Sequence, residues 1–269
     1  MATEQPRIFV ISLPQAQDRR ASISRQLDEQ GLDYEFIDAV HGKSLPREEL
    51  DRINRPLLKH YRRPFAPNEV GCYRSHGKVY QKIAEEGIPL AFVLEDDALI
   101  KTDLKRLFAD IARLKTPWEF INVGSPPGKR KYVYVKERVG DLALIEYPHK
   151  EVGAHAYLMT HAAGVKLHRM WQNPYRHNDV QLEFTWRNGI RGYYYLLPNL
   201  VWVAEGLPSA LTAERDAINE QGTALSAKFN PGYIASSISI SLHWTWLQWR
   251  ARWRYWRGEL QRPDDSLFE

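Results

Sequence analysis

The chain has 269 residues and a formal net charge of +4, and 43% of its residues are hydrophobic and 12% aromatic. This composition excludes wholesale disorder and is sufficient for one large α/β domain, or for one domain with an accessory tail. The single cysteine, Cys72, excludes an intramolecular disulfide and a cage of cysteines around zinc and fits a reducing cytoplasm. No secretory signal is visible, and no stretch of about 20 apolar residues predicts a membrane-spanning helix.

Apolar runs and helical spacings alternate along the first half of the chain. The predicted strands are 7–12, 34–37 and 90–94, and the predicted helices are 17–30 and 67–86. Residues 44–67 are charged and interrupted by prolines, which predicts short helices around a loop. Strands that alternate with helices predict a parallel sheet with helices on its faces.

The second half of the chain is less regular. Its predicted strands are 120–123, 132–136, 142–147, 193–197 and 200–203, with a flexible segment at 124–131 and a turn at Gly140-Asp141. Helices are predicted from His161 onward and at 179–188. The simplest organisation is one domain over residues 1–232 followed by a C-terminal segment over 233–269.

Three carboxylates, Glu95, Asp96 and Asp97, directly follow the predicted strand 90–94. Ligands of open α/β sheets bind just outside the carboxyl ends of such strands. Adjacent carboxylates raise one another's pKa unless a cation compensates them, and oxygen-rich sites suit magnesium or manganese, which also hold phosphates. The triplet therefore predicts a divalent metal that holds a diphosphate, with a solvated acidic turn as the alternative.

Several further segments follow one another in an order that a known family shares. They are Ile11-Ser12-Leu13 with Asp18-Arg19-Arg20, Asp38-Ala39-Val40-His41-Gly42, Glu69-Val70-Gly71-Cys72-Tyr73-Arg74-Ser75-His76, Leu94-Glu95-Asp96-Asp97 and Gly153-Ala154-His155-Ala156-Tyr157-Leu158-Met159-Thr160. Together they resemble glycosyltransferase family 25, the group of bacterial lipooligosaccharide galactosyltransferases and collagen galactosyltransferases. The resemblance implies a GT-A-like, Rossmann-type α/β/α sandwich, a UDP-sugar donor, manganese (or magnesium) as cofactor, and inversion at the anomeric carbon.

The resemblance assigns Glu95 and Asp97 to the metal site, with Asp97 as the direct ligand and with Glu95 and Asp96 in contact with metal-bound water or the nucleotide ribose. The metal would bridge both phosphates and neutralise the leaving diphosphate. Two carboxylates do not complete a coordination shell, and a later histidine is a further ligand in some GT-A enzymes. The open candidates are His149, His155, His177 and His243.

Other residues of the matching segments are candidates for donor binding. Ser12, at the end of the first strand, is placed to contact the uracil or ribose. Arg19 and Arg20 are candidates for the phosphates because guanidinium binds such oxygens bidentately, with solvated helix charges as the alternative. His76 either hydrogen-bonds the donor or packs against the sheet as a satisfied histidine, and Cys72 is interpreted as a small buried residue.

Inverting transfer needs a carboxylate that takes the proton of the acceptor hydroxyl. Asp179, at the start of the predicted helix 179–188, matches the family's acid and is the predicted catalytic base. The alternative is that Asp179 is a helix N-cap. Glu183, one turn further on, is the reserve. His177 stands where the family often has a proline.

The C-terminal segment 233–269 contains five of the nine tryptophans. Leu242, Trp246, Trp249, Trp253, Trp256 and Leu260 recur at helical spacings, and Arg250, Arg254 and Arg257 flank them. This pattern predicts an amphipathic helical tail that contacts an anionic membrane surface. The alternative is packing onto the main domain or a twin subunit. A cytoplasmic protein, peripheral at the inner face of the cytoplasmic membrane, is the expected location.

The leading functional hypothesis is an inverting, metal-dependent glycosyltransferase. It would move a hexose, with galactose favoured, from a UDP-sugar to a lipid-linked acceptor, a lipooligosaccharide or lipopolysaccharide core sugar. The alternative is a non-catalytic carbohydrate- or membrane-binding protein on a decayed transferase fold. No nucleic-acid partner is expected, because charge outside the C-terminal segment is balanced.

Overall fold

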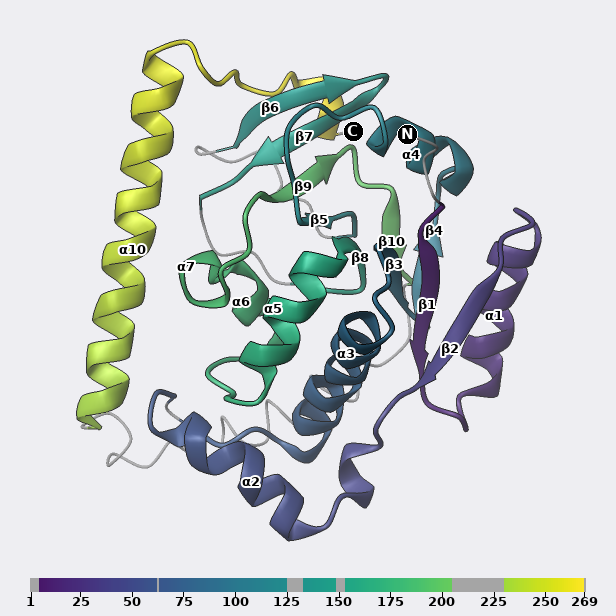
Figure 1. The fold of residues 1–269 in the computed structure, drawn as a ribbon, viewed down its shortest axis with the longest axis vertical. Helices are drawn as coiled ribbons and strands as arrows, with labels where there is room; N and C mark the ends of the chain where they lie inside the picture. The colour runs from purple at the N-terminus through teal and green to yellow at the C-terminus, as the bar shows by residue number, and fades with distance from the viewer. Residues whose placement is uncertain (1–4, 62, 125–132, 149–152, 205–229, 269) are drawn as a thin grey trace.

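A mixed eight-stranded β-sheet forms the centre of the molecule, with strand order β2-β1-β3-β8-β5-β9-β7-β6 (Figure 1). The computed structural model describes residues 5–61, 63–124, 133–148, 153–204 and 230–268. The strands of this sheet are β1 (Arg7–Ser12), β2 (Tyr34–Asp38), β3 (Leu90–Glu95), β5 (Phe120–Asn122), β6 (Tyr134–Val139), β7 (Leu142–Glu146), β8 (Ala156–Thr160) and β9 (Tyr193–Leu197). A small antiparallel pair consists of β4 (Ala98–Ile100) and β10 (Val201–Val203).

Strand direction follows the prediction at one edge of the sheet and departs from it further along. β1 is parallel to β2 and β3, and β5 is parallel to β9. β8 is antiparallel to β3 and β5, and β7 is antiparallel to β6 and β9. The described part of the chain between β5 and β8 contains the β6–β7 hairpin. A strand parallel to β5 would require a crossover connection, usually through a helix, and β8 is instead antiparallel to β5. The parallel sheet expected from the sequence therefore holds for β2, β1 and β3 and for the β5–β9 pair, and the sheet as a whole is mixed.

The helices match most of the predicted ranges. They are α1 (Gln17–Asp28), α2 (Arg47–Leu58), α3 (Pro67–Glu85), α4 (Leu104–Ile111), α5 (His161–Trp171), α6 (Asn178–Glu183), α7 (Thr185–Asn188) and α10 (Pro231–Trp256), with 3₁₀ turns η1 (Gly42–Ser44) and η2 (Asp265–Phe268). The single helix predicted over 179–188 is two short helices, because the backbone leaves the helical conformation at the buried Phe184. Of the predicted flexible segment 124–131, the residues after Gly124 lie outside the described part of the chain.

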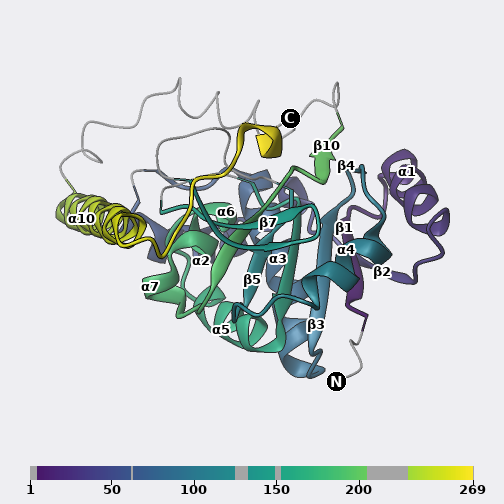
Figure 2. The ribbon, with the colours of Figure 1, turned by 90° about the horizontal axis from the view of Figure 1, so that it is seen from above.

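Alternate residues of β1 face two separate hydrophobic cores, as the two-residue period of a strand requires. Phe9 packs in one core with buried residues of α3 and α5, whereas Val10 packs in the other with α1 and α4. Figures 1 and 2 show these helices on the two faces of the sheet. The α/β/α sandwich expected from the sequence is confirmed.

Helix α10 lies along one side of the molecule, beyond the β6–β7 hairpin and α7 (Figures 1 and 2). It begins two residues before the predicted boundary at 233. Arg254 donates from Nη1 to both carboxylate oxygens of Glu146 on β7, at 2.7 and 2.8 Å. Ser236 accepts a hydrogen bond from Arg176, and Ala251 is buried beside Tyr134. The helix is therefore attached to the main domain along one face.

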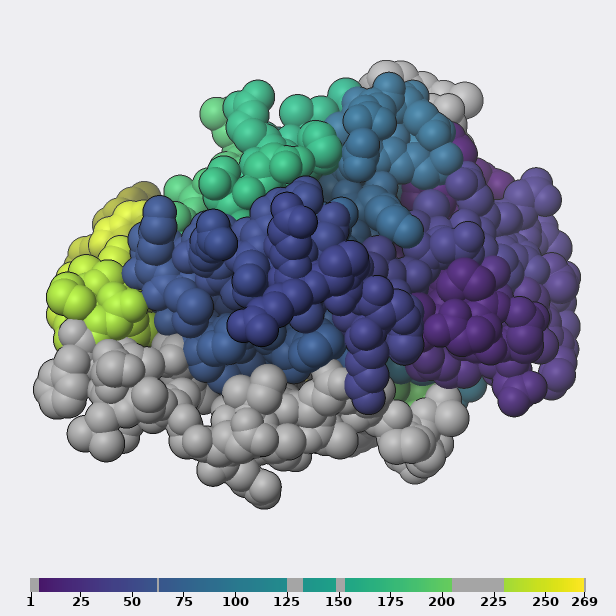
Figure 3. All heavy atoms as spheres, turned by 90° about the horizontal axis from the view of Figure 1, so that it is seen from below, coloured from purple at the N-terminus to yellow at the C-terminus, as the bar shows by residue number. Residues whose placement is uncertain are grey.

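The opposite face of α10 carries the predicted apolar stripe. The exposed members are Leu242, Trp246, Trp249, Trp253 and Trp256. Leu260, predicted as a sixth member, lies beyond the end of the helix and is buried with Ala251, so that part of the prediction is wrong. Figure 3 shows the beginning of α10 beside the surface formed by α2. Among the described helices, none combines the length and the apolar character needed to cross a bilayer.

Candidate active site

The carboxyl ends of β1 and β3 meet at one edge of the sheet, where Ile11 lies opposite Glu95 in parallel register. This register brings Ser12 to Asp96, and the Ser12 hydroxyl donates to Asp96 Oδ2 at 2.6 Å. Arg19 on α1 reaches the same group, with Nη1 at 3.1 Å from Asp96 Oδ1 and 4.0 Å from Asp97 Oδ2. Strand pairing therefore assembles the predicted triplet with two of the predicted donor-binding residues.

Arg20 lies behind this cluster and does not line its cavity. Its guanidinium donates to Ser12 Oγ at 3.2 Å, to the Ser12 carbonyl at 2.9 Å and to Asp38 Oδ1 at 2.6 Å. It also lies over the Phe36 ring, 4.6 Å from the ring centroid. In this structure Arg20 fixes the end of β1, and contact with a donor phosphate stays a prediction.

Burial disfavours the charged forms of two of the three carboxylates, Asp96 and Asp97. Burial, followed by the charges of Glu95 and Asp96, raises the pKa of Asp97 to about 6. Burial also raises the pKa of Asp96, although Ser12 and Arg19 oppose it. Among the described residues, Asp97 Oδ1 is buried and has no hydrogen-bond partner. A buried carboxylate oxygen that lacks a donor is the kind of group that a bound cation satisfies.

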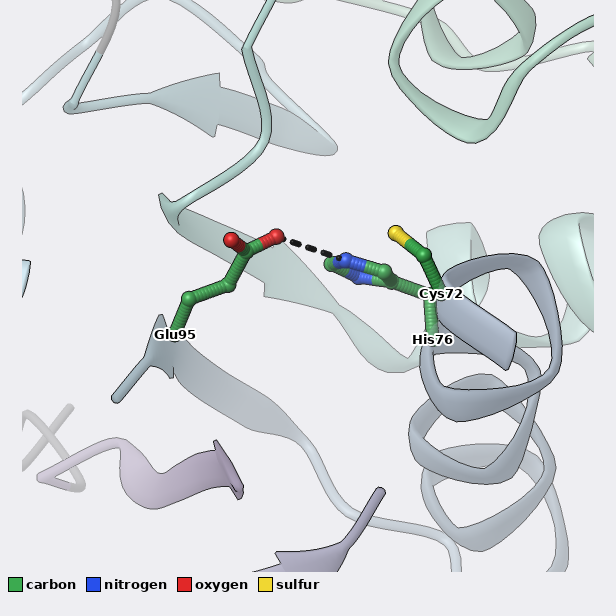
Figure 4. A group of neighbouring side chains, drawn as sticks. All are labelled: Cys72, His76 and Glu95. Carbon is green, nitrogen blue, oxygen red and sulfur yellow. Dashed lines mark hydrogen bonds and ion pairs between the residues drawn. The ribbon is translucent and has the colours of Figure 1, made fainter. Parts of the chain in front are cut away.

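Helix α3 contributes the other side of the site. Cys72 and His76 are four residues apart, so they lie on one face of this helix, and that face points toward the end of β3 (Figure 4). His76 Nε2 lies 3.1 Å from Glu95 Oε1, and the His76 ring is almost fully buried. Burial alone would raise the pKa of Glu95, but the hydrogen bond and charge of His76 outweigh burial and lower it. His76 is therefore buried and hydrogen-bonded within the protein, as the second of its two predicted roles requires, and it also faces the site.

Cys72 is not the buried structural residue that the sequence suggested. It is only half-buried, and its Sγ lies within 4.8 Å of the ligand atoms of His76 and Glu95. Gly71, just before it, is in contact with the turn at residues 40–42, where an added Cβ would lie 2.5 Å from the Val40 carbonyl oxygen. Ser75 Oγ accepts the Val40 N–H at 2.8 Å. These contacts hold the loop after β2 against α3.

Two cavities meet at this point. The larger, of about 290 Å³, is lined by the ends of β1 and β3, the loop after β2 and the start of α3, and includes Ser12, Arg19, Asp96 and Asp97. The smaller, of about 180 Å³, lies between α3, the start of β8 and α6. Among the described residues, both linings include Cys72, His76 and Glu95. The three residues therefore stand at the junction of the cavities.

Asp179 lines the smaller cavity, in the first turn of α6. The N-cap position of that helix is occupied by His177, so the N-cap alternative for Asp179 is wrong. Glu183 faces elsewhere: it is buried, accepts a hydrogen bond from the Tyr195 hydroxyl and lines a separate cavity beside α10. Of the two predicted acids, only Asp179 reaches the cavity that adjoins the triplet.

The open histidine candidates are separated by the fold. His155 and His177 line the smaller cavity, with His155 Nε2 at 3.1 Å from the Val201 carbonyl oxygen. His243 lies on α10 beside Trp186, and His149 lies outside the described residues. The histidine found beside Glu95 is His76, and a spacing of four residues from Cys72 on one helix was the sequence signal for it.

A buried ion pair that sequence reasoning missed supports the start of α3. Arg63 donates from Nη1 and Nη2 to the two carboxylate oxygens of Glu69, at 2.7 and 2.9 Å, and both side chains are almost fully buried. Glu69 also accepts the Ala66 N–H at 2.9 Å, and His177 Nδ1 lies 3.4 Å from it. The pair therefore connects α3 to the N-terminus of α6, which carries Asp179.

Replacement of Glu69 by glutamine should destabilise the protein in a pH-dependent way. Burial alone would raise the pKa of Glu69, but the Arg63 hydrogen bonds, the His177 charge and the Ala66 N–H lower it to about 2. A depressed carboxyl pKa adds stability above the ordinary value near 4.5, and this stability is lost as the pH falls through the folded value. At neutral pH, Glu69→Gln should lower the free energy of unfolding by about 3 kcal/mol.

Urea denaturation at several pH values measures this effect. The difference between the wild type and Glu69→Gln should narrow as the pH falls from about 5 toward 2. Glu48→Gln is the matched control, because Glu48 is exposed on α2, and it should change stability by less than about 0.5 kcal/mol at every pH. A pH-independent difference for Glu69→Gln would show that the ion pair is not its source.

The donor atoms at the end of β3 fit a hard divalent cation. Glu95 and Asp97 offer carboxylate oxygens, and Asp97 Oδ1 has no hydrogen-bond partner among the described residues. Burial and then the neighbouring acids raise the pKa of Asp97, which a bound cation would lower. Manganese and magnesium prefer oxygen ligands of this kind. Glu95 and Asp97 would hold such an ion, as predicted, and Arg19 would remain nearby for phosphate oxygens.

The fold and the site are those of an α/β protein with a carboxylate-rich ligand cavity at the carboxyl ends of its strands. The family model described as "Glycosyltransferase family 25 (LPS biosynthesis protein)" matches residues 5–180. The chain belongs to this family.

Curated relatives include both active and inactive proteins by name. Procollagen galactosyltransferase 1-A of Xenopus laevis is 31% identical over 173 residues, which cover 60% of this chain and 27% of that protein. Procollagen galactosyltransferase 2 of Mus musculus is 34% identical over 139 residues, covering 48% and 21%. Inactive glycosyltransferase 25 family member 3 of Mus musculus is 32% identical over 141 residues, covering 49% and 23%. The chain thus matches about a quarter of the length of each relative.

Among solved structures, a glycosyltransferase involved in the glycosylation of the major capsid of PBCV-1 aligns with 80% of this chain and 100% of its own. The TM-score is 0.44 and the sequence identity is 12%.

Proposed function

We propose that the protein is an inverting, metal-dependent glycosyltransferase that moves a hexose from a UDP-sugar to a glycan acceptor. The observation that carries the proposal is the pair of adjoining cavities. One contains a carboxylate triplet with an oxygen suited to a cation, and the other contains Asp179, a carboxylate outside the triplet that we propose acts on an acceptor. Such a division matches a reaction between an activated donor and a hydroxyl nucleophile.

The donor would occupy the larger cavity. Ser12 lines this cavity and can hydrogen-bond the nucleoside, and Arg19 can pair with phosphate oxygens once it leaves Asp96. Glu95 and Asp97 would hold manganese or magnesium, which supplies charge neutralisation for the departing diphosphate. His76, held by Glu95 and Tyr157, fixes the wall between donor and acceptor.

The acceptor would enter the smaller cavity, where Asp179 takes the proton of its hydroxyl as the oxygen attacks the anomeric carbon. The bond from that carbon to the diphosphate breaks on the opposite side, which inverts the configuration. Because His177 and the Arg63–Glu69 pair fix the start of α6, the Asp179 carboxylate is held on a rigid element.

Galactose is the proposed sugar, because two relatives are named as procollagen galactosyltransferases. A lipid-linked oligosaccharide is the proposed acceptor class, because the family description names LPS biosynthesis. The test is a transfer assay with UDP-galactose, UDP-glucose and manganese on oligosaccharide acceptors. Inverted product formed from UDP-galactose supports the proposal, and a lack of transfer or hydrolysis with every donor contradicts it.

A second candidate function is carbohydrate binding without catalysis. It is favoured by the similarity to a family member named as inactive. A binder would bind UDP-sugar in calorimetry and release no UDP over long incubation. The presence of Asp97 and Asp179 in adjoining cavities favours the enzyme instead.

Contact with an anionic membrane surface through α10 is part of the proposal, and so is a cytoplasmic location at the inner face of the membrane. Trp249 and Trp256 are 63% and 87% exposed. Arg250 and Arg257 lie over the rings of Trp246 and Trp253, at 5.0 and 4.6 Å from the ring centroids. Exposed indoles beside arginines suit the boundary between anionic headgroups and acyl chains.

The double variant Trp249→Ser with Trp256→Ser should bind anionic vesicles at least roughly tenfold more weakly, because burial of each indole contributes about 1–3 kcal/mol. Co-sedimentation with vesicles of anionic and of zwitterionic lipid measures the effect. Trp202→Ser is the matched control, since Trp202 is 46% exposed on β10 and away from the helix. Equal binding by all three proteins would instead indicate that the stripe contacts protein.

A further inference from the structure

A second set of possible metal ligands lies beside the carboxylate triplet. Cys72 Sγ, a ring nitrogen of His76 and a carboxylate oxygen of Glu95 all lie within 4.8 Å of one another. Figure 4 shows the side chains directed toward a common space between α3 and the end of β3. Thiol, imidazole and carboxylate together are a donor set that zinc favours and that magnesium and manganese do not.

The orientation of His76 is fixed by a chain of buried hydroxyl groups. His76 Nδ1 lies 2.9 Å from the Tyr157 hydroxyl. Tyr157 is hydrogen-bonded to Tyr80, whose hydroxyl donates to Asn178 Oδ1 at 3.1 Å. The Tyr157 hydroxyl donates its hydrogen to Tyr80, so its oxygen accepts the Nδ1–H of His76. The other ring nitrogen, Nε2, then faces Glu95. Metal-binding histidines are oriented in this way by a partner on the other ring nitrogen.

We infer that Cys72, His76 and Glu95 form a site for zinc or a similar soft divalent cation, distinct from the oxygen site at Asp97. The ligand atoms, within 4.8 Å of one another, are close enough to share one zinc ion, whose bonds are about 2.3 Å to sulfur and about 2.0–2.2 Å to nitrogen and oxygen. Binding would displace the thiol proton of Cys72. The site needs one cysteine only, so the exclusion of an all-cysteine cage does not apply to it.

Zinc at this site would inhibit sugar transfer, a consequence that rests on the proposed function. Cys72, His76 and Glu95 line both cavities, so an ion bound by all three occupies their junction. It would also withdraw Glu95 from the triplet and stand between the donor and the acceptor hydroxyl. Because the two ions would share Glu95, manganese should relieve this inhibition only when it is in large excess over zinc, since manganese binds thiolate poorly.

Cobalt(II) is the probe that tests the site without reference to activity. The full chain, treated with chelator and kept in a reductant without thiols, should give a near-ultraviolet thiolate-to-cobalt charge-transfer band at about one equivalent. Cys72 is the one cysteine of the chain, so it is the sole possible source of such a band. Zinc should abolish the band at equimolar concentration.

Variants assign the ligands. Cys72→Ser should lack the charge-transfer band, and His76→Gln should weaken cobalt binding at least roughly tenfold. Asp97→Asn, the control at the oxygen site, should keep the charge-transfer band. Circular dichroism shows that each variant is folded. No band in the folded wild type, or an unchanged band in Cys72→Ser, would overturn the inference.

The inhibition is tested separately by titrating zinc into the transfer assay and comparing, for each protein, the inhibited with the uninhibited rate. Half-inhibition of Cys72→Ser should need at least roughly ten times more zinc than the wild type. An active enzyme whose cobalt band is displaced by zinc without loss of rate would disprove the inhibitory role. A chain with the band and no transfer activity would contradict the proposed function and leave the metal site established.

Discussion

Asp97→Asn is expected to lower the rate of sugar transfer roughly a thousandfold. The substitution keeps the shape of the side chain and removes the charge and the oxygen that a cation would use. A metal at a leaving group supplies several kcal/mol of charge stabilisation, and each 1.4 kcal/mol is a factor of ten in rate. Steady-state transfer from UDP-galactose, with manganese titrated, measures the effect, and apparent manganese affinity should fall with it.

Stability separates this loss from misfolding. Because the pKa of Asp97 is raised to about 6, its ionisation at neutral pH lowers the stability of the folded protein relative to the unfolded chain. The metal-free variant should therefore unfold at the same temperature as the wild type or at a higher one. Asp141→Asn, at an 85% exposed side chain in the β6–β7 turn, is the control and should change neither quantity. Full activity of Asp97→Asn in excess chelator would contradict a metal role.

Asp179→Asn should lower kcat about 10²–10⁴-fold, the range typical of a lost general base, and should leave donor binding intact. Asp179 lines the smaller cavity and is not among the described residues that line the larger one, so UDP-sugar and manganese should bind in the larger cavity without it. Calorimetry with UDP and manganese, together with transfer kinetics, distinguishes the two variants. Asp179→Asn should lose transfer and keep donor binding, whereas Asp97→Asn should lose both transfer and metal-dependent donor binding.

Glu183→Gln is the matched control for Asp179. Glu183 is on the same helix but is buried against Tyr195, so its replacement should affect stability more than kcat. If Glu183→Gln loses activity while Asp179→Asn keeps at least half of it, the assignment of the base is incorrect.

The features that the sequence predicted correctly depend on short-range chemistry. The apolar run before Glu95 forms a buried strand, and the triplet lies at its end. Helix α1 occupies Gln17–Asp28 within the predicted range 17–30, and α3 occupies Pro67–Glu85 within the predicted range 67–86. Such elements are set by side-chain periodicity, caps and glycine, which are local properties.

The features that it missed are contacts between distant segments. His76 meets Glu95 19 residues later. Glu69, near the start of α3, lies 3.4 Å from His177, which comes just before α6. The direction of β8 depends on what connects it to β5, and no periodicity encodes that. Leu260 continues the helical spacing of the tryptophans, yet the helix ends at Trp256 and Leu260 turns into the core instead.

Diffraction from a crystal soaked with manganese and UDP is the most direct measurement of the central claim. An anomalous peak is expected beside Asp97 and Glu95, with the diphosphate on the far side of the ion and the nucleoside against Ser12. A peak and a nucleotide bound elsewhere, with the Asp97 carboxylate unchanged, would contradict it.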